Sequence, residues 1–220
     1  MPVAPIQPYF AVPVASVLLA HGNELNDALR ARLLEWERDE GVRTSVPTEV
    51  PKHAVYESDF SLFYRKDALI AELARLCLGT LGDLIMRING YSAAEMQNLR
   101  IYHHSWYHIT RYGGYTSGHN HPMASWSGVY CVAPGEELSD RPDSGVLRLY
   151  DPRVNSLMYL DPGNAHFGPP YGAGSLPMRL RPGELVLFPS YLRHEVAPFW
   201  GRDDRITVAF NAWVREAGQA

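Results

Sequence analysis

Residues 182–211 read PGELVLFPSYLRHEVAPFWGRDDRITVAFN and contain two strand-like runs separated by turns. Apolar residues dominate positions 184–188 and 206–214, and Pro182-Gly183 marks a turn before the first run. Runs of similar composition, again bounded by Gly, Pro or Asp, occupy residues 99–112, 125–132 and 145–150. Short strands with regular turn signals predict a mainly β fold, a sandwich or a barrel.

Two amphipathic helices are predicted before these strands. Residues 24–40 place Leu and Trp side chains on one stripe, with Asn23 positioned to cap the helix and Gly41 to end it. Residues 67–88 repeat the pattern over more turns, and a capping-box sequence for a short third helix starts at Ser92. We expect the helices to cover one outer face of the sheet.

The length and composition predict one domain that spans residues 1–220. Of the 220 residues, 46% are hydrophobic, which is sufficient for one sizeable core, and no repeat or linker-like break divides them. Within this domain, residues 1–97 are expected to form a mainly helical part and residues 98–215 the strand-rich core. We interpret residues 10–20 as a strand and residues 42–64 as a connector.

Charge and cysteine content limit the partners and the compartment. The 20 basic and 24 acidic residues give a formal net charge of −4, so the basic surface that nucleic-acid binding requires is missing. No run approaches the roughly 18 uninterrupted apolar residues of a membrane helix. Cys77 and Cys131 are expected to be buried free thiols, which predicts a cytoplasmic protein. A homodimer is compatible with the sequence.

Histidines carry the candidate chemistry. Residues i and i+2 of a strand project to the same face, so His119 and His121 can reach one point. His194 follows the apolar run at 184–188 and can supply a third imidazole, and three imidazoles can bind one face of a metal ion and leave the opposite positions open. Other histidines are interpreted as ordinary strand or loop residues: His103, His104, His108 and His166.

Arg205 is a candidate for binding an anionic ligand and lies eleven residues after His194. A guanidinium binds a carboxylate through two parallel hydrogen bonds, and Thr207 on the same strand face can add a third. Ala209 and Asn211 continue this small and polar face, as expected for a strand that lines a ligand cavity. The alternative is a solvated arginine at the end of a hairpin.

Several stretches, in a fixed order, carry a resemblance to a known family. They are HNHPMASWSGVY at 119–130, SGVL at 144–147 followed by DPR at 151–153, PGELVLFPSYLRH at 182–194 and RITVAFN at 205–211. Together they resemble a bacterial and phage family of 2-oxoglutarate/Fe(II) oxygenases of unknown substrate, over residues 9–214.

The resemblance has consequences for fold, cofactors and site. It implies a double-stranded β-helix, or jelly-roll, core with N-terminal helices, Fe(II) as the metal and 2-oxoglutarate as the cosubstrate. It also implies that His119, His121 and His194 bind the metal and that Arg205 binds the cosubstrate, with Thr207 beside it in an arrangement similar to the superfamily's Arg-x-Ser. The chain is therefore expected to be a dioxygenase that hydroxylates a small molecule or a protein side chain.

One residue departs from the wider superfamily, whose usual iron site has two histidines and one carboxylate. Here His121 stands at the second position of the pair, so the iron would lack a negatively charged ligand. Three arrangements follow: three imidazoles bind the iron alone, Asp151 contributes a carboxylate, or one of the paired histidines orients a ligand or a water. We favour the three imidazoles.

Two other functions stay open on the sequence. The spacing from Gly113 to His121 resembles the first cupin motif, but Ser125 or Trp126 stands where a cupin has a glutamate, so only a three-histidine cupin-like metalloenzyme without 2-oxoglutarate would fit. A noncatalytic β-sandwich binding protein is the second alternative. Aromatic residues that could line a cavity in any of these proteins are Tyr102, Tyr112, Trp126 and Tyr130.

Overall fold

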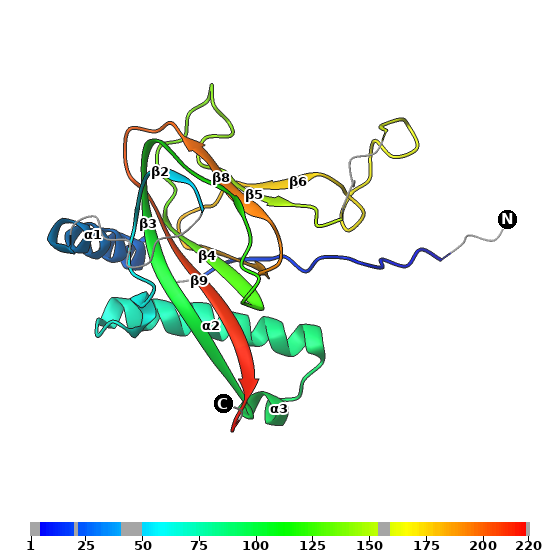
Figure 1. The fold of residues 1–220 in the computed structure, drawn as a ribbon, viewed down its shortest axis with the longest axis horizontal. Helices are drawn as coiled ribbons and strands as arrows, with labels where there is room; N and C mark the ends of the chain where they lie inside the picture. The colour runs from blue at the N-terminus through cyan, green and yellow to red at the C-terminus, as the bar shows by residue number, and fades with distance from the viewer. Residues whose placement is uncertain (1–4, 20–21, 41–49, 154–158, 219–220) are drawn as a thin grey trace.

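The structure of the chain, a computed structural model, describes residues 5–19, 22–40, 50–153 and 159–218. In chain order its elements are β1 (Ala15–Leu18), α1 (Gly22–Glu40), β2 (Lys52–Glu57), the 3₁₀ helix η1 (Leu62–Tyr64), α2 (Ala68–Asn89), α3 (Ala93–Gln97), β3 (Leu99–His119), β4 (Trp126–Ala133), β5 (Leu147–Tyr150), β6 (Ser175–Met178), β7 (Glu184–Pro189), β8 (His194–Phe199) and β9 (Arg205–Glu216). The chain is mainly β, as predicted, and Figure 1 shows the arrangement of these elements.

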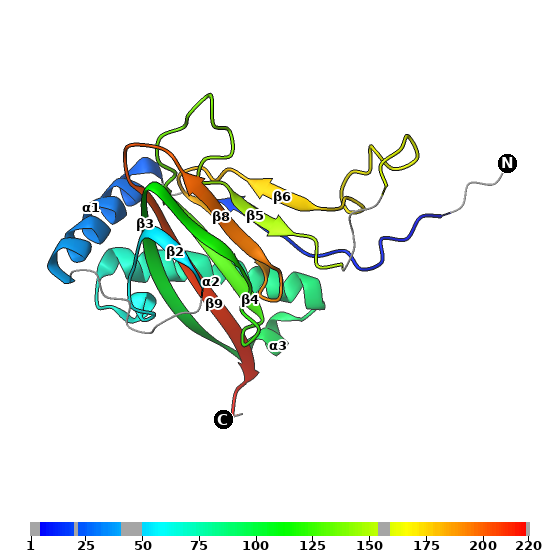
Figure 2. The ribbon, with the colours of Figure 1, turned by 45° about the horizontal axis from the view of Figure 1, so that its top comes forward.

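The strands of the described residues form one antiparallel sheet in the order β1-β7-β4-β9-β3-β8-β5-β6, with β2 beside β3. The sheet curls because the long strand β3 changes partner along its length. Residues 99–110 pair with β9, whereas residues 114–119 pair with β8 through an irregular register. In Figures 1 and 2, β8, β5 and β6 form the part of the curled sheet farthest from α2. As a result, only the C-terminal end of β3 lies beside β8.

Helices α1 and α2 cover one face of the sheet, as expected (Figure 1). Leu29 of α1, Leu81 of α2 and Phe210 of β9 are fully buried in the core between the helices and strands β4, β7 and β9. A second apolar cluster, which includes Val186 and Phe188 of β7, packs on the opposite face. Apolar burial on both faces provides the main driving force for folding.

Local sequence explains where α2 and α3 begin and end. The Asp67 side chain accepts hydrogen bonds from the backbone N–H groups of Leu69 and Ile70 at the start of α2. Gly90 ends α2 with a φ of 70°, a left-handed conformation that glycine adopts without steric cost. The predicted capping box at Ser92 is confirmed and starts α3.

The predicted helices at 24–40 and 67–88 correspond to α1 and α2. The prediction that Asn23 caps the first helix is wrong, because α1 already begins at Gly22. Gly41, the predicted end of that helix, lies outside the described residues. None of the described helices is both long enough and apolar enough to span a membrane.

The interpretation of residues 42–64 as a connector is wrong in part, because they contain β2 and η1. Residues 1–97 are consequently not only helical: β1, shorter than the strand expected at 10–20, pairs with β7, and β2 pairs with β3. Both strands belong to the same sheet as the C-terminal strands. The N-terminal part of the chain thus supplies side chains to the region around the histidines.

Candidate metal centre and adjoining cavities

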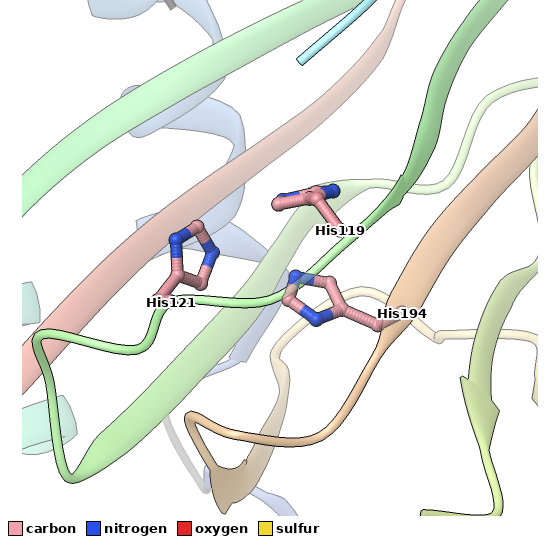
Figure 3. Close-up of side chains that lie close together, drawn as sticks. All are labelled: His119, His121 and His194. Atoms are coloured by element: carbon pink, nitrogen blue, oxygen red, sulfur yellow. The ribbon is translucent and has the colours of Figure 1, made fainter. Parts of the chain in front are cut away.

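Three histidine side chains converge in Figure 3, namely His119, His121 and His194. Each offers one ring nitrogen such that the three atoms lie within 4.8 Å of one another. No carboxylate or thiol of the described residues belongs to this group. We call it the histidine cluster, and it unites the three residues that the sequence selects.

Two strand ends and one turn position the histidine cluster. His119 is the last residue of β3 and lies opposite His194, the first residue of β8. His121 lies beyond the end of β3, so the expectation that one strand carries both histidines is wrong. Its backbone N–H donates to the carbonyl of Ser190 at 2.9 Å, which fixes the turn against the end of β7. The two paired imidazoles converge all the same.

Backbone carbonyls orient two of the rings. His119 Nδ1 lies 2.8 Å from the Ser117 carbonyl oxygen, and His194 Nδ1 lies 3.0 Å from that of Leu192. Because a carbonyl only accepts, each of these rings carries its proton on Nδ1 and presents the lone pair of Nε2. Metal-binding histidines in proteins are commonly held in this way.

Burial keeps the histidine cluster neutral. Removal from solvent, assisted by the neighbouring imidazoles, lowers the pKa of His121 to about 3 and the pKa of His194 to about 4. Burial lowers the pKa of His119 as well. Neutral imidazoles do not have to release protons when a divalent metal ion binds. The cluster can therefore act as a three-nitrogen metal site at neutral pH.

Arg205 is the most unusual charged residue near the cluster. It is only 3% exposed, and within residues 50–153 and 159–218 no carboxylate forms an ion pair with it. Burial lowers its pKa from the ordinary value, but a guanidinium stays protonated at neutral pH. A Cβ atom at Gly145 would lie 3.0 Å from Arg205 Cδ, so this glycine makes room for the arginine stem. The guanidinium of Arg205 is therefore a buried positive charge without a carboxylate partner among the described residues.

The histidine cluster and Arg205 line one cavity, which we call the inner cavity. The predicted alternation of β9 is confirmed, since Thr207 and Asn211 also face this cavity while Ile206 and Val208 lie in the helix-side core. Thr207 is 3% exposed. Other lining residues are Ser127, Val129, Leu147, Phe188 and Val196. An arginine, a hydroxyl and three imidazoles thus meet in one largely apolar space.

A second space of about 190 Å³, the outer cavity, adjoins the inner cavity beside β2. The two cavities share Trp106, His108, Thr116, His119, His121 and Asn211. In the outer cavity, Lys52 Nζ lies 2.8 Å from Glu57 Oε2, and His108 Nε2 lies 2.6 Å from the same oxygen. Burial alone would raise the pKa of Glu57, but the hydrogen bonds and charges of His108 and Lys52 outweigh it and lower this pKa to about 2.

Asp151 does not lie with the histidine cluster. Its carboxylate forms an ion pair with Arg153 and lines a different cavity, near Val12 and Val14 of the N-terminal segment. None of the three histidines lines that cavity. The alternative in which Asp151 completes the metal site is therefore wrong in this structure.

The structure also sorts the other predicted residues. Tyr102 and Tyr112 are exposed, and Trp126 and Tyr130 pack in or against the helix-side core, so none of these aromatic residues lines the inner or the outer cavity. The aromatic residue between the cavities is Trp106, which is 7% exposed. His104 and His108, interpreted as ordinary strand residues, line the outer cavity, whereas His103 faces the helix side and His166 is exposed as expected.

Sequence comparison adds the family. The family model described as "Putative 2OG-Fe(II) oxygenase" matches residues 104–211, a segment that contains the histidine cluster, Arg205 and Thr207. This segment belongs to the 2OG-Fe(II) oxygenase family. The description names the metal and the cosubstrate that the sequence predicts, so the family, the type of enzyme and its cofactors are confirmed at that level. No protein of curated function matches this oxygenase chain.

Solved structures agree on the fold. A prolyl-4-hydroxylase from Pseudomonas putida superposes with a TM-score of 0.58 at 15% identity, covering 93% of both chains. The carbocyclase SnoK from nogalamycin biosynthesis gives a TM-score of 0.61 at 14% identity, covering 95% of this chain and 83% of its own. HygX from Streptomyces hygroscopicus, with nickel and 2-oxoglutarate bound, gives 0.56 at 12% identity, covering 92% and 83%. These likenesses confirm the predicted double-stranded β-helix fold.

Proposed function

We propose that in this oxygenase the histidine cluster binds Fe(II) and that Arg205, with Thr207, binds the 5-carboxylate of 2-oxoglutarate. The observation that carries the proposal is the buried guanidinium of Arg205, which has no carboxylate partner among the described residues and faces the same cavity as three neutral imidazoles. A dicarboxylate cosubstrate would provide the missing negative charge, and the Thr207 hydroxyl would provide a further hydrogen bond.

The histidine cluster and Arg205 would have different roles in the reaction. When bound, iron and 2-oxoglutarate supply the oxidation of a substrate C–H bond by O₂, with decarboxylation to succinate. The neutral histidine cluster would hold one face of the metal, and Arg205, which lines the same inner cavity, would fix the orientation of the cosubstrate. Phe188, Val196 and Leu147 keep that cavity apolar, which strengthens the ionic contacts inside it.

The proposed reaction is a hydroxylation of a small molecule or of a protein side chain. Both kinds of substrate occur among the structural neighbours, which include the prolyl-4-hydroxylase and the carbocyclase, and a prolyl hydroxylase from Trichoplax adhaerens in complex with a peptide. We further propose a cytoplasmic location, supported by the two free, buried thiols Cys77 and Cys131. The single domain and the homodimer stay predictions of the sequence.

Titration calorimetry of Arg205 variants tests the proposal. With the metal-loaded protein kept free of oxygen, Arg205→Ala should weaken 2-oxoglutarate binding by about 30-fold or more, since losing the partner of a buried charge costs about 2–5 kcal/mol. Arg205→Lys should recover only part of the loss, because an ammonium cannot form two parallel bonds to a carboxylate. Iron binding should be nearly unchanged in both variants.

Arg153→Ala serves as the control, because Arg153 pairs with Asp151 away from the inner cavity. It should bind 2-oxoglutarate as the parent does. Equal 2-oxoglutarate affinity in the parent and in Arg205→Ala would remove Arg205 from the cosubstrate site.

The three-histidine cupin-like metalloenzyme is the second candidate. One observation favours it: no carboxylate of the described residues joins the histidine cluster. If the parent protein binds iron but shows no affinity for 2-oxoglutarate, this second function replaces the first.

A further inference from the structure

The outer cavity is separate from the space assigned to 2-oxoglutarate. Arg205, Thr207 and His194 line only the inner cavity, whereas Lys52 and Glu57 of β2 line only the outer cavity. Both cavities reach His119 and His121, so a molecule in the outer cavity would lie next to the metal site without displacing the cosubstrate.

Trp106 presents a hydrogen-bond donor at the boundary between the cavities. Its indole Nε1 lies 3.2 Å from His108 Nε2, but Glu57 Oε2 lies closer to the same nitrogen, at 2.6 Å. The Glu57 carboxylate is ionised and can only accept. His108 Nε2 therefore carries a proton and donates a hydrogen bond to Glu57. A protonated nitrogen cannot accept from Trp106. The indole N–H of a side chain that is only 7% exposed therefore has no acceptor among the described residues.

Asn211 adds a second donor on the same wall. The Ser127 hydroxyl donates to Asn211 Oδ1 at 2.8 Å, so the amide Nδ2 is the atom of this side chain that can donate, and Asn211 lines both cavities. Acceptors are scarce by comparison. Glu57 is the one carboxylate among the described lining residues, and it already accepts from Lys52 and His108. The cavity next to His119 and His121 thus has two donors, on Trp106 and Asn211, and its one carboxylate is already paired.

The charge balance of the proposed centre points the same way. Three neutral imidazoles leave Fe(II) with both of its positive charges, 2-oxoglutarate contributes two negative charges, and Arg205 contributes one positive charge. The assembled site then carries one net positive charge, whereas a carboxylate ligand in place of one imidazole would have made it neutral. A buried site of this kind favours an anionic group nearby.

We infer that the outer cavity binds the substrate of this oxygenase through a carboxylate, which accepts hydrogen bonds from the Trp106 indole N–H and the Asn211 amide. The inference rests on the proposed function, because it needs a metal centre beside the cavity. It defines the substrate as an acid, held at its carboxylate, with the carbon to be oxidised directed toward His119 and His121.

The test compares carboxylates with their amides. Binding of phenylacetate, phenylacetamide, N-acetylglycine and N-acetylglycinamide is measured by calorimetry on the oxygen-free protein loaded with Fe(II) and saturated with 2-oxoglutarate. At least one carboxylate should bind about tenfold or more tightly than its amide, because hydrogen bonds to charged acceptors are the stronger ones. Trp106→Phe keeps an aromatic ring but removes the indole N–H. It should lower the affinity for that carboxylate by about tenfold and the affinity for the corresponding amide by less.

Two further variants sharpen the result. Asn211→Asp keeps the shape of the side chain but replaces a donor with a negative charge. It should also lower the affinity for the carboxylate more than the affinity for the amide. This variant provides the test if Trp106→Phe does not fold. Trp126→Phe is the matched control, since Trp126 packs against the helix-side core and lines neither cavity. It should leave the preference for the carboxylate over the amide unchanged.

The outcomes separate the inference from the function on which it rests. If the loaded parent binds no 2-oxoglutarate, the proposed function fails. If 2-oxoglutarate binds normally but amides bind as tightly as carboxylates, or no carboxylate binds at millimolar concentration, the substrate inference alone fails. A carboxylate preference that survives unchanged in both Trp106→Phe and Asn211→Asp would mean that the probe binds the metal directly, and it would also overturn the inference.

Discussion

The three imidazoles of the histidine cluster are held unequally. Backbone carbonyls fix the rings of His119 and His194, whereas the structure gives the His121 ring no hydrogen-bond partner among the described residues. If all three bind iron, replacing any one by alanine should lower iron affinity by about 100-fold or more, because residues that only orient a ligand typically account for about 10- to 100-fold. Metal content after dialysis, and titration with Fe(II) under argon, measure the loss.

His166 provides the control for these variants, because it is an exposed loop histidine far from the cluster in sequence. His166→Ala should keep the iron affinity of the parent. A cluster variant that also keeps this affinity would no longer count among the metal ligands, and His121, the least constrained of the three, is the residue for which this outcome would be most informative.

Strand β4 depends on a glycine at its centre. A Cβ atom at Gly128 would lie 2.3 Å from the ring of Phe210, which is fully buried and packs against Phe63. Both rings are buried in the core, so Gly128→Ala should lower the free energy of unfolding by about 1–3 kcal/mol through overpacking. Urea denaturation followed by circular dichroism measures the change.

Gly79→Ala is the matched control, since Gly79 is exposed on α2 and a Cβ there would meet nothing within 4 Å. Alanine in an exposed helical position should raise the free energy of unfolding by about 0.5–1 kcal/mol. Equal effects of the two substitutions would contradict the tight contact between β4 and β9.

Hydrophobic pattern identified the elements whose apolar residues repeat clearly, but it missed β2 and the end of β3. Helix α2 and strand β9 have clear periodicity and were predicted nearly to their ends. Strand β2 was not predicted, because its short sequence, KHAVYE, mixes charged and apolar residues and becomes a strand only by pairing with β3. The strand-like run predicted at residues 99–112 also ends too early, because β3 continues through Gly113 and Gly114 with an irregular register. Pairing between distant segments decided both cases.

The candidate site shows the same division. The positions of His119, His121 and His194 in the sequence predicted that they lie together, and the structure places them together. Glu57 was not found, because it reaches the cavity on the unpredicted strand β2. Trp106 lies on a predicted strand, but alternation along a strand assigns a residue to a face without showing which part of that face borders a cavity. Such residues require the tertiary structure.

The molecule as a whole buries several histidines in neutral form, which makes its metal-free stability depend on pH. Burial lowers the pKa of His103, His121 and His194 below the ordinary value of about 6.5. The unfolded chain therefore binds protons that the folded chain does not, below about pH 6.5. The free energy of unfolding should fall as the pH is lowered from 7 to 5, by up to about 1.4 kcal/mol per pH unit for each such histidine. Glu57 adds a loss in the same direction at lower pH, between its ordinary pKa of 4.5 and about 2.

His103 allows this prediction to be tested away from the metal site. It is 9% exposed, stacks on Tyr64 with ring centroids 4.5 Å apart, and its Nδ1 has no hydrogen-bond partner among the described residues. Phenylalanine keeps the stacking and removes the unpaired nitrogen, so His103→Phe should gain about 1 kcal/mol at pH 7. The gain should be larger at pH 5, because the variant has no proton to bind at this position in the unfolded state.

Urea denaturation in the presence of a chelator at pH 7, 6 and 5 measures both effects, with His166→Phe as the exposed control that should leave the pH dependence as it is. A parallel shift of His103→Phe at all three pH values would mean that the His103 pKa is not lowered by folding, and the acid sensitivity would then have to come from the histidine cluster alone.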